Sequence, residues 1–120
     1  MAMQMQYGAG KKASTGNFFE LIWENSSPTS SFSAQTVNLD LSPYMAIAIE
    51  INTTTSGSVQ AIGLIMVGTS GVAFGRSGSS GTTYGRGAAV TSAGVTFANG
   101  YSGSTAGSGY AIPRRIWGIR

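Results

Sequence analysis

Apolar side chains recur at every second position in several short segments of this chain, and this period limits the possible folds more than any other feature. In segment 44–52 the large apolar residues are Met45, Ile47, Ile49 and Ile51. The positions between them carry Tyr44, Ala46, Ala48 and Glu50. Successive side chains of a β-strand point to opposite faces of a sheet, so the first set is expected in a core. No segment sustains the 3.6-residue period of an amphipathic helix.

The residues between the alternating segments favour tight turns. Gly, Ser and Thr occupy 47 of the 120 positions, with only three Pro. Short strands at regular spacing, joined by turns rich in Gly and Ser, are typical of antiparallel sandwiches. We therefore expect an all-β fold of about eight strands, an antiparallel β-sandwich or a jelly-roll-like domain. Residues 17–120 are expected to form this single domain, and residues 1–16 a lead-in or linker.

Three local patterns predict how particular strands are connected. Segments 72–76 and 82–86 share an aromatic-Gly-Arg core and are expected to be the two arms of a hairpin. Asn99-Gly100 predicts a two-residue hairpin turn, because both residues accept a positive φ. Pro113 is expected to divide the closing strand into 110–112 and 115–119, since proline cannot donate to a strand ladder.

The side chains that most catalysis and metal binding require are scarce in this chain. It contains no Cys and no His, which removes thiol nucleophiles, thiolate ligands and the commonest general base. On a strand, Glu20 and Glu24 would lie roughly 13 Å apart, too far for the usual carboxylate pair of a glycosidase. Asp40 belongs to no calcium-loop pattern. We therefore expect a protein that is not an enzyme, with no metal and no cofactor.

The charges are few and unevenly placed. All four carboxylates lie in the first fifty residues, whereas all five arginines lie in the last forty-five. The two halves could pair in the fold or between subunits, or the arginines could form a basic patch. Arginines interspersed with aromatic residues are typical of stacking surfaces as well as of core aromatics with flanking charges. The candidate contacts for a ligand or partner are Arg76, Tyr84, Arg86, Tyr101, Arg114 and Arg115.

Two segments predict self-association, because they are apolar on both faces. Segments 44–52 and 59–67 need cover on both sides, whereas a sandwich buries one face of each sheet. Their small residues permit a close approach of another backbone. We therefore expect a subunit interface near Tyr44, Ala46, Ala48, Ala61 and Gly63. The alternative is that these residues pack against the opposite sheet of the same monomer.

No segment is expected to cross a membrane. The longest apolar stretch, 61–67, is far shorter than the roughly 20 residues that a spanning helix needs. Residues 1–10 lack the basic and then apolar pattern of a secretory signal. Synthesis in the cytoplasm is therefore expected.

Two stretches resemble the small C-terminal β-domains of tailed-bacteriophage fibre and minor tail proteins. The first stretch reads Trp23-x-Asn25-x-x-Pro28-x-x-x-Phe32, followed by Val37-x-Leu39-x-Leu41-x-x-Tyr44. The second is the ending, Tyr110-x-Ile112-Pro113-x-x-Ile116-Trp117-Gly118-Ile119-Arg120. The resemblance implies a trimeric virion module, made in the host cytoplasm, that contacts a host-surface glycan or protein or another virion protein. It carries over no catalytic residue, and we expect no nucleic-acid partner. The alternative function is a free-standing carbohydrate-binding β-sandwich module.

Overall fold

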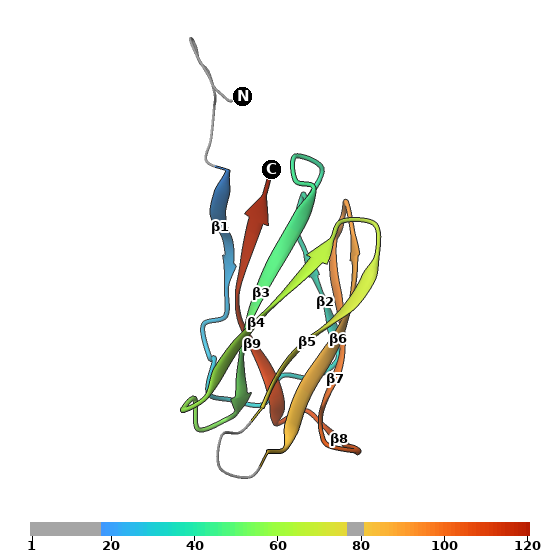
Figure 1. The fold of residues 1–120 in the computed structure, drawn as a ribbon. Coiled ribbons are helices and arrows are strands. Elements are labelled where there is room, and N and C mark those ends of the chain that lie inside the picture. The colour runs from blue at the N-terminus through green and yellow to red at the C-terminus, as the bar shows by residue number, and fades with distance from the viewer. Residues whose placement is uncertain (1–17, 77–80) are drawn as a thin grey trace.

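The computed structural model describes residues 18–76 and 81–120, which form nine β-strands and no helix (Figure 1). The strands are β1 (Phe19–Glu24), β2 (Gln35–Asn38), β3 (Ala46–Thr54), β4 (Gln60–Met66), β5 (Ser70–Arg76), β6 (Thr83–Thr91), β7 (Gly94–Ser102), β8 (Thr105–Gly107) and β9 (Tyr110–Ile119). The expected all-β class is therefore confirmed. The expected lead-in, residues 1–16, lies outside the described residues.

The strands form two antiparallel sheets that pack face to face as a sandwich. The first sheet has the order β1-β9-β3-β4. The second has the order β2-β7-β6-β5, with β8 added beside β7. Strand β9 is the last in the sequence, yet it lies between β1 and β3 and contributes to the middle of the first sheet. The predicted sandwich is confirmed.

The core lies between the two sheets and is built from alternating positions of the strands. Ile47, Ile49 and Ile51 of β3 are completely buried, as the alternation predicts. Val90 of β6 and Val95 of β7 belong to the same buried cluster. Met45, which continues the alternation in the sequence, is instead 52% exposed, because it precedes the first residue of β3.

Two predicted strand connections are wrong, and one is confirmed. Strands β5 and β6 form the expected hairpin, with Phe74 opposite Gly85. Asn99-Gly100, however, lies inside β7 at a register shift opposite β6, and the chain turns only after Ser102. Similarly, β9 continues through Pro113, which lies at the register shift opposite β3.

Tertiary contacts explain why Asn99-Gly100 is part of a strand. The side-chain oxygen of Asn99 accepts a hydrogen bond from the backbone N–H of Ala34, at 3.2 Å. A Cβ atom on Gly100 would lie 1.9 Å from the carbonyl oxygen of Tyr110. The lack of a side chain at Gly100 therefore lets the backbones of the two sheets approach each other closely. The turn is made instead at Gly103, which has a φ of 58°.

The sandwich tapers at one side, where β4 and β5 end their respective sheets. We call these two strands, residues 60–66 and 70–76, the β4–β5 edge. Their facing positions are small: a Cβ on Gly63 would lie 2.8 Å from Cα of Ala73, and a Cβ on Gly75 would lie 2.7 Å from Cβ of Ala61. Because so little side-chain volume separates the strands, the two sheets converge here.

Candidate functional site

The predicted contact residue Arg86 is not on the surface. Its side chain is only 1% exposed, in the interior between β6, β7 and β9. The guanidinium donates from Nε to the carbonyl oxygen of Ala111 at 2.8 Å, and from Nη1 to that of Ala98 at 2.7 Å. Nη2 donates to the carbonyl oxygens of Tyr110 and Ser108, at 2.9 and 3.4 Å. Arg86 is therefore a structural residue, and its prediction as a ligand contact is corrected.

Burial leaves Arg86 charged at neutral pH. Desolvation lowers its pKa from 12.5 to about 10, which is still well above neutral pH. The guanidinium carbon also lies 5.3 Å from the centroid of the Phe32 ring, in a cation–π contact. A buried charge must be fully hydrogen-bonded to be tolerated, and backbone carbonyls supply those acceptors here.

Arg114 and Arg115 lie on the other sheet and pair with carboxylates from the first half of the chain. Arg114 Nη1 contacts Glu50 Oε1 at 2.8 Å. Arg115 lies 3.4 Å from Glu24 and 3.6 Å from Glu50. The indole N–H of Trp117 also donates to Glu50. Glu24 and Glu50 of the first half of the chain therefore pair within the fold with arginines of the second half, which was the first of the two alternatives.

Tyr44 belongs to a similar network at the end of the sandwich. Its hydroxyl donates to Glu20 Oε1 at 2.5 Å, and Arg120 Nη2 contacts the same oxygen at 2.7 Å. The guanidinium of Arg120 lies 5.0 Å from the Tyr44 ring centroid. The hydrogen bond from Tyr44, followed by that from Arg120, lowers the pKa of Glu20. The hydrogen bond to Glu20 is also the main reason that the pKa of Tyr44 is raised.

The other three predicted contacts lie at neighbouring positions in the register of β5, β6 and β7, but their side chains make separate contacts. Arg76, at the end of β5, donates from Nε and Nη2 to the carbonyl oxygen of Gly81. The ring of Tyr84 packs against Tyr110, with centroids 6.0 Å apart. Tyr101 covers Gly85, where an added Cβ would lie 2.4 Å from the Tyr101 hydroxyl. The six residues therefore do not form one site.

The predicted interface residues are divided between the two faces of the first sheet. In the register of β3 and β4, Gly63 lies opposite Ile49 and Ala61 opposite Ile51, so both share the core face. Gly63 and Ala61 pack against β5 of the same monomer, as the alternative held. Ala46 and Ala48 lie on the outer face, where larger neighbours leave them only 3% exposed.

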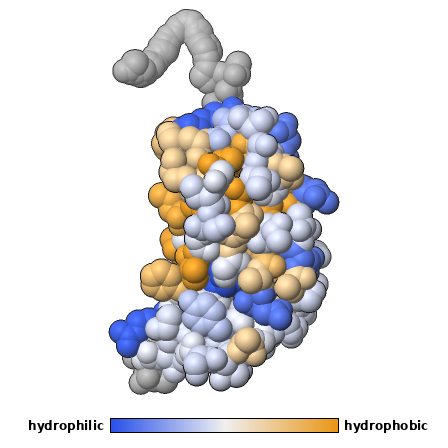
Figure 2. Space-filling model, turned by 90° about the vertical axis from the view of Figure 1, so that its right-hand side faces the viewer, coloured by the Kyte–Doolittle hydropathy of each residue, from blue (hydrophilic) through white to orange (hydrophobic). Residues whose placement is uncertain are grey.

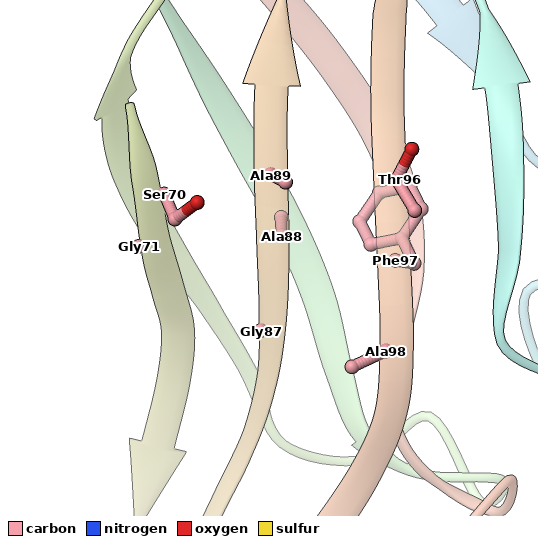
Figure 3. A pocket seen from close by; sticks show the side chains of 8 residues that line it. All are labelled: Ser70, Gly71, Gly87, Ala88, Ala89, Thr96, Phe97 and Ala98. Atoms are coloured by element: carbon pink, nitrogen blue, oxygen red, sulfur yellow. The ribbon is translucent and has the colours of Figure 1, made fainter. Parts of the chain in front are cut away.

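A shallow depression of about 320 Å³ lies on the outer face of the second sheet (Figure 3). Its lining comprises Ser70, Gly71, Gly87, Ala88, Ala89, Thr96, Phe97 and Ala98. The outward-pointing side chains are short, and the Phe97 ring lies on the core side of β7. The depression is therefore an uncharged and mostly apolar hollow over β5, β6 and β7.

Large apolar side chains are exposed beside this depression and on the outer face of the first sheet. Those of the β4–β5 edge are Ile62, Leu64, Met66, Val72 and Phe74. Those near the start of the described chain are Phe18, Phe19 and Leu21. Figure 2 shows apolar side chains gathered along one side of the molecule. Exposed apolar surfaces of this size are typical of interaction sites.

The described residues show no group of metal ligands. Residues 18–76 and 81–120 contain no cluster of three or more His, Cys, Asp or Glu side chains that could hold a metal ion. In the same ranges, no helix is long and apolar enough to cross a membrane. Comparison with known protein families, with curated proteins and with solved structures finds no match to this chain.

Proposed function

We propose that this domain is a non-enzymatic structural module of a bacteriophage particle, at a fibre tip or as a tail or head decoration. It acts as a homotrimer that contacts the host surface or other virion proteins. The observation that carries the proposal is the exposed apolar surface of the β4–β5 edge, on a chain in which only 9% of residues are charged. A surface of this kind suits stable protein contacts better than the steering of a charged substrate.

The arrangement of the charged groups also supports a non-catalytic role. Glu20, Glu24 and Glu50 are each held by an arginine. Asp40 accepts hydrogen bonds from the backbone N–H and the hydroxyl of Ser42, in a local turn. Each of these carboxylates thus has a structural partner within the fold.

Light scattering across a concentration series tests the homotrimer. A mass of three times the 12.3 kDa chain supports the proposal, and a constant 12.3 kDa up to high concentration contradicts it. The place in a particle is tested separately, by immunogold electron microscopy with an antibody against the domain. Labelling of assembled particles supports a virion role, and labelling of free protein alone contradicts it.

The second candidate function, a free-standing carbohydrate-binding module, is favoured by one observation. The depression over β5, β6 and β7 has Ser70 and Thr96 hydroxyls in its lining, and Tyr101 lies on the same outer face. An aromatic ring beside hydroxyl groups can bind the apolar face and the hydroxyl rim of a neutral sugar. A 12.3 kDa monomer that binds neutral oligosaccharides, and loses binding when Ala89→Phe fills the depression, would favour this alternative.

A further inference from the structure

The β4–β5 edge lacks the features that normally keep an edge strand from pairing with another chain. Both strands have seven residues, without proline, and Arg76 at the end of β5 is their only charged residue. Natural edge strands are protected by charges, proline, bulges, or a very short length. An unprotected apolar edge of this length predicts that another protein surface covers it.

The other edges of the two sheets carry such protection in the described residues. Strand β1 contains Glu20 and Glu24, and its pairing with β9 is interrupted by a register shift. Strand β2 has four residues, and β8 has three. The contrast shows that the β4–β5 edge is the exception in this fold.

Both outer faces of the tapered edge are apolar and exposed. On β4, Ile62, Leu64 and Met66 are 58, 69 and 50% exposed. On β5, Val72 and Phe74 are 42 and 58% exposed. At roughly 100 Å² for each half-exposed side chain, these five offer on the order of 500 Å² of apolar area. The three β4 side chains account for about 300 Å² of this area and the two β5 side chains for about 200 Å², so the backbone and flanking residues must supply the rest of the roughly 800 Å² that each partner buries in a standard interface.

The two faces differ in shape in a complementary way. The outer face of β4 is a ridge of three large side chains. The outer face of β5 adjoins the depression over Gly87 and Ala89, which is lined by short side chains. In a threefold ring, each copy contacts its two neighbours through two different surfaces. One ridge and one hollow on opposite sides of a tapered edge meet this requirement.

We propose that the covering partner is a second copy of this chain, with the β4 ridge of one copy packed against the outer face of β5 and the adjoining depression of the next. This inference rests on the proposed homotrimer and assigns the surface that forms it. An identical copy fits because both surfaces are essentially uncharged, so that no charge is buried unpaired on contact. Ala46 and Ala48, next to Leu64 and Met66 in the register, lie at the margin of this contact.

Cysteine cross-linking tests the pairing directly, because the chain has no cysteine of its own. Leu64→Cys and Phe74→Cys are prepared separately, mixed under exchange conditions, and treated with a short bis-maleimide. The expected result is a covalent dimer in the mixture and little in either variant alone. Equal cross-linking of Leu64→Cys alone would indicate a twofold contact and overturn the proposal. The matched control is Leu21→Cys, whose side chain is 44% exposed on β1.

Charge insertion separates this inference from the proposed homotrimer itself. Leu64→Lys and Phe74→Lys are expected to reduce the mass from three copies to one, while Leu21→Lys leaves three. All three side chains are exposed, and circular dichroism verifies the fold of each variant. Trimers that persist in Leu64→Lys and Phe74→Lys overturn the inference and leave the homotrimer standing. An unmodified protein that stays monomeric contradicts both.

Hydrogen exchange of the unmodified protein gives a measurement that depends on no variant. Amides of β4 and β5 are expected to exchange more slowly as the concentration rises, whereas those of β1 do not change. Concentration-dependent protection of β1 in place of β4 and β5 would overturn the proposed contact.

Discussion

Arg86 donates from Nε to the carbonyl oxygen of Ala111 at 2.8 Å, and Ala111 has a positive φ of 49°. The left-handed conformation costs an L-residue roughly 1–2 kcal/mol, so it persists only where other contacts favour it. Arg86 belongs to one sheet and Ala111 to the other. The guanidinium therefore joins the sheets at the point where β9 enters the core.

Arg86→Met is expected to destabilise the domain by about 3–5 kcal/mol, because it leaves several buried carbonyl groups without a donor. Arg86→Lys should recover only part of this loss, since an ammonium group cannot reproduce the planar fork of donors. Urea denaturation measures both changes. The control is Arg76→Met, at an exposed arginine, with an expected change below about 1 kcal/mol. Equal effects of Arg86→Met and Arg76→Met would contradict the structural role.

Ile47→Ala and Ile49→Ala are each expected to cost about 2–5 kcal/mol, the range for truncating a buried isoleucine. Met45 occupies the same alternating set in the sequence but is half exposed. Met45→Ala is therefore expected to change the free energy of unfolding by less than about 0.5 kcal/mol. Thermal and urea unfolding measure all three. Shifts below this level for both isoleucines would show that the core face of β3 is assigned incorrectly.

Gly63→Ala is expected to destabilise the domain by about 1–3 kcal/mol through overpacking against β5. Its Cβ would lie 2.8 Å from Cα of Ala73, a backbone atom that cannot move aside cheaply. Gly87→Ala is the matched control, because its Cβ would meet only ordinary contacts, the nearest at 3.8 Å. Unfolding is measured in dilute solution, below the concentration for association. A neutral Gly63→Ala variant there would contradict the close packing of Gly63 against β5.

Glu20 is expected to make the stability of the domain depend on pH in the acidic range. Its pKa in the folded state is lowered, by hydrogen bonds from Tyr44 and Arg120, relative to 4.5 for the free side chain. A lowered carboxyl pKa contributes stability that is present above the unfolded value and is lost as the pH falls through the folded value. Glu20→Gln should therefore flatten the loss of stability below about pH 4.5. Asp40→Asn is the comparison, since the pKa of Asp40 is lowered by Ser42 alone. Identical acid profiles for Glu20→Gln and the unmodified protein would contradict this coupling.

Hydrolysis of glycans, esters and phosphates is expected to remain at background. Activity that survives repurification, and that disappears when Glu20, Glu24, Asp40 or Glu50 is replaced, would show that one of these carboxylates is catalytic.

Local sequence determined the strands where the period of two is clear, because alternation depends only on which residues must avoid water. Segment 44–52 shows this: the alternation correctly placed Ile47, Ile49 and Ile51 in the core. The β5–β6 hairpin was likewise predicted from its repeated aromatic-Gly-Arg pattern. The lack of Cys and His also limited the possible chemistry, since no fold can supply side chains that the chain does not contain.

Sequence reasoning selected the wrong residues of segment 59–67 as the outward contact. That segment is apolar on both faces, which led to the expectation that something covers it from outside. The small residues Ala61 and Gly63 were chosen, yet they face β5, and the exposed side chains are Ile62, Leu64 and Met66. A strand with two apolar faces does not reveal which face is inside, because that depends on the register with β3.

Tertiary structure alone decided the roles of Arg86, Asn99 and Gly100. An arginine is normally exposed, and only the convergence of carbonyl groups from β7 and from residues 108–111 makes its burial possible. Asn99-Gly100 has the local preference for a turn, but contacts with Ala34 and Tyr110 hold it in β7. The sequence by itself determined the clearly alternating strands and the absence of thiol and imidazole side chains. The packing of distant strands decided which small residues are internal and which arginines are buried, since these depend on partners far away in the chain.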